Sequence, residues 1–484
     1  MNRFNGGIPV AGWTSGDYTL AREFASRRLS MIPRARTGLR SCALCVMVCV
    51  FVLLLAVPAM AQREQESEDR SKILGAYFEE WSIYYAGYGL ANLESNGSAA
   101  KLSHLLYAFA NVTSPTPTGS SCVIADAWAD FESPYLAPVG GIPSVSPLFG
   151  NFAEIVKLKQ LHPKLKTLIS IGGASAANAA AFSAAASSDA GRKALVASCI
   201  NMFVLGNVGS YWNGTVVVPG LFDGFDIDWE FPTAADKPNF TLLLKEFRKQ
   251  LNELSETTGK IYLLSFFGPA GAQNYTNIDL SEAAELVDFI NVQGYDFAGA
   301  WEATTNHASP LFDARQNPNF GQELDLNDVV NAYLSAGVPK HKISMGLPLY
   351  GHGWMGVPNT FHGLYQNSTG PSAVLLANGT GNCPDLSGNT AGCDTLLTPG
   401  NATYATLSTV TANGYTRYYD PERVAVWLYN ASTETFYTYD DPFTAMLKMI
   451  YVDARELGGA YVWAAKDDDA SGTMIKTMAR WLGR

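Results

Sequence analysis

Four acidic residues fall within one twelve-residue stretch of this 484-residue chain, L-F-D-G-F-D-I-D-W-E-F-P at 221–232. Apolar and acidic residues alternate from Phe225 to Glu230, and this pattern predicts a β-strand. Residues two apart in a strand point to the same face. We therefore expect Asp226, Asp228 and Glu230 to share one face, with successive residues about 6.6 Å apart along the strand.

Three carboxyl groups on one face of a strand can carry out acid–base chemistry. Like charges held this close raise the pKa of at least one of them, and a carboxyl that stays protonated near neutral pH can act as a general acid. The alternatives are an acidic edge strand and a calcium site. Phe225, Ile227 and Trp229 argue against an isolated surface strand, because they occupy the opposite face and need an apolar layer. Asp223 is out of phase with the other acids and is expected at a turn or a strand start.

The spacing D-x-x-D-x-D-x-E resembles the signature of the family 18 glycoside hydrolases, the chitinases and their relatives. Three further motifs resemble the same family: S-I-G-G at 170–173, the pair Tyr295-Asp296, and Trp463 within G-A-Y-V-W. The resemblance extends over 72–484 and is strongest to secreted chitinases that carry an α+β insertion domain.

The resemblance implies a division of roles among the site residues. The catalytic candidates are Asp226, Asp228, Glu230 and Tyr295. The substrate-binding candidates are Tyr77, Gly172, Gly173, Gln293, Asp296, Trp301 and Trp463. No cofactor is implied, and the six scattered histidines lack the spacing of metal ligands.

The implied reaction is hydrolysis of β-1,4-linked N-acetylglucosamine polymers with retention of the anomeric configuration. Family 18 departs from the usual retaining pair of acid and carboxylate nucleophile, since the substrate's own 2-acetamido oxygen attacks the anomeric carbon. Glu230 would act first as acid and then as base. Asp228 would orient the acetamido group, and Asp226 would share a proton with Asp228. Tyr295 would hydrogen-bond the acetamido oxygen, and Trp463 would stack on the sugar.

Three positions near these motifs depart from the residues common in chitinases. Ala174 stands where many have Trp, Gln293 where many have Met, and His352 where many have Arg. Two other functions therefore stay open, a chitin-binding protein with weak catalysis and an endo-β-N-acetylglucosaminidase that acts on N-glycans. The presence of Glu230 weighs against the first.

Strand-like and helix-like segments alternate from Lys72 onward. Strands are expected at 73–78, 102–112, 166–173, 222–230, 261–267, 287–295, 342–349 and 459–464. Apolar spacing predicts helices at 152–161, 240–254, 329–334 and 473–482. Eight strands that alternate with helices predict a parallel (β/α)8 barrel, the TIM barrel.

One unit of this alternation is oversized. A Gly/Ser/Thr/Asn-rich part and a strand-like segment at 424–439 separate the seventh strand from the eighth. Because a loop this long without structure is improbable, we expect a small α+β insertion there. The predicted domains are a barrel at 72–350 and 446–484 and an insertion at 351–445.

The first part of the chain, 1–61, is predicted to be a leader. Uncharged residues at 42–61 follow three arginines and end in Ala59-Met60-Ala61, which indicates a cleaved signal peptide. The alternative is an uncleaved signal anchor, since about 20 apolar residues can span a bilayer. Residues 62–71 are expected to form a short tether, and the mature protein is expected to be secreted.

Four cysteines beyond the leader suit a secreted protein with two disulfides. Cys383 and Cys393 are close in sequence and are expected to pair, which leaves Cys122 for Cys199. Nine N-x-[ST] sequons after the leader are typical of the surface loops of an extracytoplasmic glycoprotein.

The formal net charge of −11 argues against a nucleic-acid partner and is compatible with a neutral sugar polymer. The expected partner is chitin or an N-acetylglucosamine oligosaccharide. No membrane contact is expected of the mature chain unless the leader remains as an anchor. The protein is expected to act as a monomer.

Overall fold

The chain folds around a closed barrel of parallel strands. The computed structural model describes residues 72–84, 86–113, 119–211, 214–373 and 399–484. The barrel strands in chain order are β1 (Ile73–Glu79), β2 (His104–Val112), β4 (Lys166–Gly173), β7 (Gly224–Trp229), β8 (Leu263–Gly268), β9 (Phe289–Val292), β10 (Ile343–Pro348) and β17 (Gly459–Trp463). Among the described residues these eight strands form one sheet, which closes because β1 pairs with both β2 and β17. The predicted TIM barrel is therefore confirmed.

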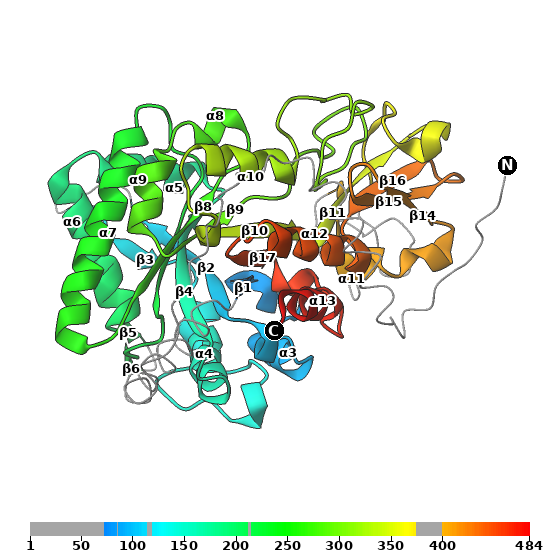
Figure 1. The fold of residues 1–484 in the computed structure, drawn as a ribbon. Coiled ribbons are helices and arrows are strands. Elements are labelled where there is room, and N and C mark those ends of the chain that lie inside the picture. The colour runs from blue at the N-terminus through cyan, green and yellow to red at the C-terminus, as the bar shows by residue number, and fades with distance from the viewer. Residues whose placement is uncertain (1–71, 85, 114–118, 212–213, 374–398) are drawn as a thin grey trace, which may run out of the picture. The chain divides into compact units, whose positions relative to one another are not determined.

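Helices surround the barrel (Figure 1). They are α3 (Leu90–Ser95), α4 (Gly150–Leu161), α5 (Ala176–Ala186), α6 (Asp189–Cys199), α7 (Lys237–Thr258), α8 (Ala272–Tyr275), α9 (Leu280–Leu286), α10 (Leu326–Ser335), α12 (Pro442–Ala454) and α13 (Thr473–Leu482). The short helix α11 (Tyr404–Leu407) belongs instead to the segment between the seventh and eighth barrel strands. Short 3₁₀ helices lie at Glu80–Ile83, Ala99–Lys101, Val139–Gly141, Lys340–Lys342, Thr360–Gly363, Val410–Asn413 and Ala465–Asp467, and π-helical turns at Trp128–Glu132 and Ile200–Val204.

The helix α7 shows how the apolar spacing produces the fold. Its buried face includes Phe240, Leu243 and Phe247, which are at most 1% exposed. This face packs toward β7, where Phe225 lies 5.3 Å from Phe247 between ring centroids. The helix ends at Gly259, whose φ of 68° lies in the left-handed region where glycine has no steric penalty.

The sixth barrel strand is shorter than the sequence predicts. The expected strand spans 287–295, whereas β9 ends at Val292. A side chain at Gly294 would place a Cβ 2.1 Å from the carbonyl oxygen of Gly346, so the chain passes very close to β10 here. Asp296 then takes a φ of 62°, which no extended strand adopts. This turn directs the chain away from the sheet just before Asp296.

The predicted insertion between the seventh and eighth barrel strands forms an antiparallel sheet. Its strands are β11 (Tyr350–Met355), β12 (Gly370–Pro371), β13 (Asn401–Thr403), β14 (Thr416–Asp420), β15 (Ala425–Asn430) and β16 (Thr435–Tyr439). The strand-like segment predicted at 424–439 is a hairpin of two strands rather than one strand. Barrel and insertion belong to one compact unit, Ile73–Arg484.

Three shorter strands lie outside these two sheets or at their edge. The strand β3 (Cys122–Ile124) pairs antiparallel with β2, and β5 (Asn207–Tyr211) pairs with β6 (Gly214–Val217). The segment predicted as leader and tether lies outside the described residues. No helix in the described part of the chain is both long and apolar enough to span a bilayer.

A disulfide joins Cys122 of β3 to Cys199 at the end of α6. This confirms one of the two predicted pairs. The other, Cys383 with Cys393, lies outside the described residues. Cys122 and Cys199 are both buried, with at most 2% of their surface exposed. The bond closes a loop of 77 residues, so it restricts the unfolded chain strongly.

We expect the double replacement of Cys122 and Cys199 by alanine to lower the free energy of unfolding by about 2–5 kcal/mol, because loop-closure entropy is lost. We choose alanine rather than serine, because serine would bury an unpaired hydroxyl at each position. Thermal unfolding of both proteins, with and without a reducing agent, measures the change. The reductant should lower the melting temperature of the wild type more than that of the variant, which keeps Cys383 and Cys393, and an equal response of both proteins would contradict the prediction.

Candidate active site

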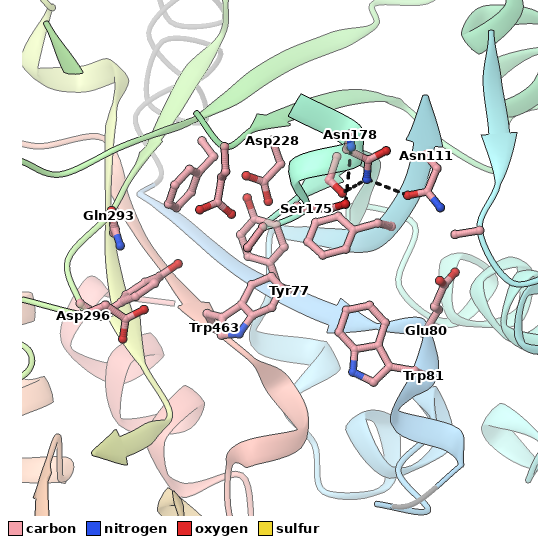
Figure 2. Close-up of a pocket in the computed structure, with 18 of the residues that line it drawn as sticks. Tyr77, Glu80, Trp81, Asn111, Ser175, Asn178, Asp228, Gln293, Asp296 and Trp463 are labelled. Atoms are coloured by element: carbon pink, nitrogen blue, oxygen red, sulfur yellow. Dashed lines mark hydrogen bonds between the residues drawn. The ribbon is translucent and has the colours of Figure 1, made fainter. Parts of the chain in front are cut away.

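The carboxyl ends of the barrel strands surround a cavity of about 680 Å³. Enzymes with this fold place their active sites at this end of the barrel. Figure 2 shows the cavity with its lining side chains. Nine of the eleven predicted site residues line it: Tyr77, Gly172, Gly173, Asp228, Glu230, Gln293, Tyr295, Asp296 and Trp463. The other two, Asp226 and Trp301, do not belong to its lining.

Asp226 is fully buried within the barrel, on the strand that carries Asp228. Its carboxylate accepts four hydrogen bonds from other barrel strands. The donors are Tyr77 Oη of β1 at 2.7 Å, Ser170 Oγ of β4 at 2.8 Å, Ser265 Oγ of β8 at 2.6 Å and Asn291 Nδ2 of β9 at 3.1 Å. Burial raises the pKa of Asp226, and these hydrogen bonds oppose the shift because they favour the charged form.

Asp228 and Glu230 form a pair of interacting acids in the cavity. Burial raises the pKa of Asp228 well above its usual value, and the charges of Glu230 and Asp226 add to the shift. Burial also raises the pKa of Glu230 to about 7, with a further contribution from Asp296, while a hydrogen bond with Asp228 opposes the shift. The pair therefore retains a proton near neutral pH. Asp228 is hydrogen-bonded to Glu230, and the charge of Asp226 raises the pKa of Asp228 further.

Aromatic side chains form a continuous wall of the cavity. The ring centroids of Tyr77 and Trp463 lie 5.0 Å apart, and Trp463 stacks on Phe109 at 5.7 Å. Phe109 in turn lies 5.9 Å from Trp81. These rings come from the ends of β1, β2 and β17, or from residues just beyond them. They provide apolar faces against which sugar rings can stack.

Gly172 and Gly173 end β4 where it passes closest to its neighbours. A Cβ at Gly172 would lie 2.0 Å from the carbonyl oxygen of Asp228, and one at Gly173 would lie 2.7 Å from the ring of Phe109. Both glycines have positive φ, 122° and 82°. Only glycine therefore lets β4 approach the acid-bearing strand at this point.

Tyr295 and Asp296 follow β9 and enter the cavity from the side of the insertion. Tyr295 Oη lies 3.2 Å from Tyr461 Oη of β17. Asp296 Oδ1 accepts a hydrogen bond from Tyr350 Oη at 2.7 Å and lies 2.8 Å from His352 Nε2. Tyr350 and His352 both belong to β11, so the first strand of the insertion fixes the orientation of the Asp296 carboxylate.

Gln293 and Trp301 differ in their relation to the cavity. The side-chain oxygen of Gln293 accepts a hydrogen bond from the amide of Ala270 at 3.0 Å, which anchors it in the wall. Trp301 is 62% exposed and packs its ring against His352, 4.9 Å away between centroids. A substrate contact by Trp301 stays a prediction, because the ring lies outside the cavity lining.

Sequence reasoning missed several residues of the site. Ser265 and Asn291 donate to Asp226, Phe109 completes the aromatic wall, and Tyr350 holds Asp296. Ser265 is the direct cross-strand neighbour of Asp226. A polar residue inside an otherwise apolar strand was the signal that could have found Ser265 and Asn291. Phe109 and Tyr350 had no such signal, since aromatic residues are common in barrel strands.

Side chains outside the predicted set also line the cavity, and they include acidic, amide and aromatic groups. Glu80, Trp81, Asn111 and Asp126 all line it. In the described part of the chain, no group of three or more His, Cys, Asp or Glu side chains is arranged to hold a metal ion.

A sequence profile described as Glycosyl hydrolases family 18 matches residues 73–468, a range that contains every barrel strand. The chain belongs to this family. The resemblance inferred from the acid motif is thus confirmed over 73–468, which includes all eight barrel strands and the insertion.

Several curated proteins are similar to this family 18 chain. Chitinase A1 of Niallia circulans is 30% identical over 460 residues, which cover 86% of this chain and 60% of that protein. Chitinase ChiA of Flavobacterium johnsoniae is 30% identical over 87% of this chain, but the chain spans only 28% of its length. Chitinase 1 of Aphanocladium album is 29% identical, with 89% of this chain and 90% of that protein covered.

Solved structures of other chitinases share the fold of this family 18 chain. The catalytic domain of psychrophilic chitinase B from Arthrobacter TAD20 is 29% identical and superposes with a TM-score of 0.74. The alignment covers 85% of this chain and 95% of that structure. Chitinase ChiA74 from Bacillus thuringiensis gives a TM-score of 0.71 at 28% identity, over 85% of this chain and 70% of that one.

The raised pKa of Glu230 has a consequence for stability. The folded pKa of about 7 exceeds the model-compound value of 4.5, so the folded protein binds more protons than the unfolded chain between these limits. Stability is therefore lost as the pH rises through this window. We expect Glu230→Gln to raise the free energy of unfolding at pH 8 by roughly 1–3 kcal/mol and to change it little at pH 4.

Urea unfolding of wild type and variant at both pH values measures this difference. Glu285→Gln is the matched control, since Glu285 lies exposed on α9 and its replacement should leave stability nearly unchanged at either pH. A gain for Glu230→Gln of equal size at pH 4 and pH 8 would show that the burial of the Glu230 charge is not its cause.

Proposed function

We propose that this chain is a chitinase that hydrolyses β-1,4-linked N-acetylglucosamine polymers with retention of configuration and with help from the substrate's own 2-acetamido group. The observation that carries the proposal is the Asp228–Glu230 pair, which retains a proton inside the cavity. Family membership and the names of the five similar proteins reported above, which are chitinases, support the substrate class.

Glu230 is the general acid and base in this proposal. A pKa of about 7 leaves a large fraction of its carboxyl protonated at neutral pH, ready to donate to the leaving glycosidic oxygen. The carboxylate that results then removes a proton from the incoming water. Glu230 directly follows the last residue of β7, at the barrel end where the catalytic residues of this fold lie.

Asp228 is poorly suited to act as a carboxylate nucleophile. Burial raises its pKa well above the usual value, which disfavours the carboxylate form that a nucleophile needs, and it is only 3% exposed. The attacking oxygen therefore comes from the substrate itself, as the family exception to the two-carboxylate mechanism allows. Asp228 would orient the acetamido group and, by sharing its proton with Asp226, stabilise the positive charge of the oxazolinium intermediate.

Tyr295, Asp296 and Trp463 would position the sugar at the reacting centre. The Tyr295 hydroxyl would hold the acetamido oxygen, Asp296 would contact the sugar hydroxyls, and the Trp463 ring would support the ring face. Pre-set geometry of this kind can lower the barrier of an intramolecular attack by about 7–11 kcal/mol. The anchoring of Asp296 by two residues of β11 supports such a rigid arrangement.

We also propose that the protein works outside the cytoplasm, where its polymeric substrate is found. The buried Cys122–Cys199 disulfide supports this location, since such bonds persist in oxidising compartments. The predicted leader at 1–61 is the expected export signal.

We expect Glu230→Gln to reduce hydrolysis of N-acetylglucosamine oligomers by about 10²–10⁴-fold, because the amide cannot donate and then accept the proton. The wild type should release products that are initially β-anomers. Time-resolved nuclear magnetic resonance of a tetramer or pentamer digest reports both quantities.

Glu285→Gln supplies the comparison for this assay, since it makes the same chemical change on an exposed helix position. Release of α-anomers by the wild type would contradict the retaining mechanism. Binding of the oligomers without cleavage would indicate a chitin-binding protein. Cleavage of N-glycan cores in preference to the oligomers would indicate an endo-β-N-acetylglucosaminidase.

We expect Asp296→Asn to shift the alkaline limb of the pH profile of kcat/KM to lower pH. The negative charge of Asp296 raises the pKa of Glu230, so its removal lowers that pKa, and the acid form is then lost at lower pH. The position of the limb is compared with that of wild type and of Asp189→Asn, a change on the exposed start of α6. An unmoved alkaline limb in Asp296→Asn contradicts the proposed charge coupling.

A further inference from the structure

The cavity has an unbalanced charge. Five carboxyl side chains line it, and its described lining contains no lysine, arginine or histidine. Asp228, Glu230 and Asp296 are used by the proposed reaction. Glu80 and Asp126 are not, and nothing in the hydrolysis of a neutral polymer requires two additional acids in the substrate cleft.

These two acids lie away from the reacting centre. Figure 2 shows Glu80 and Trp81 at one end of the pocket and Gln293 and Asp296 at the other, with Trp463 between them. Glu80 directly follows β1 and stands next to Trp81, the last ring of the aromatic wall. A polymer that lies along this wall would therefore reach Glu80 beyond the sugar that stacks on Trp463.

Glu80 is held in an environment that lacks a cation. It is 5% exposed and its carboxyl is hydrogen-bonded to Asp130, while its buried Oε2 accepts no hydrogen bond from a donor group among the described residues. Behind it, Asp130 is 1% exposed and accepts a hydrogen bond from Tyr107 Oη. No described lysine, arginine or histidine forms an ion pair with Glu80, Asp126 or Asp130.

Glu80 and Asp130 retain protons, whereas buried acids in proteins are usually ionised and paired with a positively charged side chain. Burial and the nearby charge of Asp130 raise the pKa of Glu80 to about 11, and burial raises that of Asp130 to about 7. Like charges this close cannot both ionise without a compensating cation. Buried acids are otherwise paired with a base, so this cluster has room, electrostatically, for a positive group of the ligand.

Asp126 stands in front of this pair with a fixed orientation. Its Oδ2 accepts a hydrogen bond from Tyr84 Oη at 2.5 Å, and its Oδ1 accepts one from the amide of Ala129 at 3.1 Å. Its charge also contributes to the raised pKa of Glu80, so the two side chains interact. Asp126 is partly exposed to the cavity and can contact a ligand there.

The wall opposite the aromatic rings is polar at this end. Ala174 leaves no aromatic ring there, and Asn111 lines the cavity with its side-chain oxygen bonded to Asn178 Nδ2 at 2.8 Å. Asn178 also donates to the carbonyl of Gly172 at 2.7 Å, which ties this wall to the end of β4. The end of the cleft therefore combines one stacking face with polar and anionic groups.

We propose that this end of the cleft is a subsite for a glucosamine unit, whose C2 ammonium binds Asp126 and Glu80, so that the preferred substrate is partly deacetylated chitin. This proposal rests on the proposed function and adds the chemical pattern of the substrate. On binding, the ammonium takes the place of a proton that leaves the Glu80–Asp130 pair for solvent. Affinity for the glucosamine unit should accordingly rise with pH while its amine stays protonated.

The two ends of the cleft would then require opposite substituents. The sugar cut next to Glu230 must carry an acetamido group, because its oxygen is the nucleophile. The sugar at Glu80 is favoured when its acetyl group is absent. A fully deacetylated chain would bind and escape cleavage, and a fully acetylated chain would be cleaved without the benefit of the ion pair.

The test compares N-acetylglucosamine pentamers of equal length: one fully acetylated, one with a single glucosamine at the non-reducing end, and one with it at the reducing end. We expect wild type to show a kcat/KM about tenfold higher for one of the two glucosamine-containing pentamers than for the acetylated one, as a charge-assisted hydrogen bond provides. Glu80→Gln and Asp126→Asn should each bring this ratio toward one. Glu285→Gln should keep it.

Binding measured by calorimetry in Glu230→Gln gives a second readout that does not depend on turnover. The preference should weaken in high salt, since it arises from charge. If wild type cleaves the acetylated pentamer and shows no preference for either glucosamine, or if the preference survives both Glu80→Gln and Asp126→Asn, the subsite proposal is wrong and the proposed function stands. If no pentamer is cleaved, the proposed function fails, and the calorimetric ratio alone decides the subsite.

Discussion

The arrangement of the site depends on one buried carboxylate. Asp226 has no exposed surface, and a charge in that position is costly unless it is fully hydrogen-bonded. Tyr77, Ser170, Ser265 and Asn291 supply the hydrogen bonds from four different strands. Because these donors must converge on one side chain, the relative heights of the strands are fixed. The positions of Asp228 and Glu230, further along the same strand as Asp226, follow from that register.

The acids above Asp226 cannot all be charged at once. Each added carboxylate raises the pKa of its neighbours. The Asp228–Glu230 pair therefore retains a proton, which reduces the charge repulsion. The same condition that destabilises the folded protein at high pH therefore produces an acid suited to neutral pH. Close backbone approach at Gly172 lets a second strand reach this group without a side chain between them.

The insertion contributes to the site as well as to the outline of the cleft. Its first strand, β11, starts directly after the seventh barrel strand and places Tyr350 and His352 against Asp296. Asp296 adds to the raised pKa of Glu230, so a contact made by the insertion acts on the electrostatics of the barrel. At the far end of the cleft, Glu80 and Asp126 extend the row of acidic side chains along the cavity.

The sequence by itself determined the strand that bears the acids, the barrel and the family. Alternation with a period of two is a local property, so Asp226, Asp228 and Glu230 could be placed on one face without any knowledge of their neighbours. Helical spacing identified α7 and α13 in the same way, and the even number of cysteines indicated the Cys122–Cys199 bond, which the structure confirms.

Only the tertiary structure decided how these residues interact. The hydrogen bond from Tyr77 to Asp226 spans 149 positions of the chain, and that from Asn291 spans 65, so no local pattern could reveal either. The position of Trp301 outside the cavity and the Glu80–Asp130 pair have the same origin. Each depends on which side chains a closed barrel brings together, and that depends on strand register and burial rather than on sequence spacing.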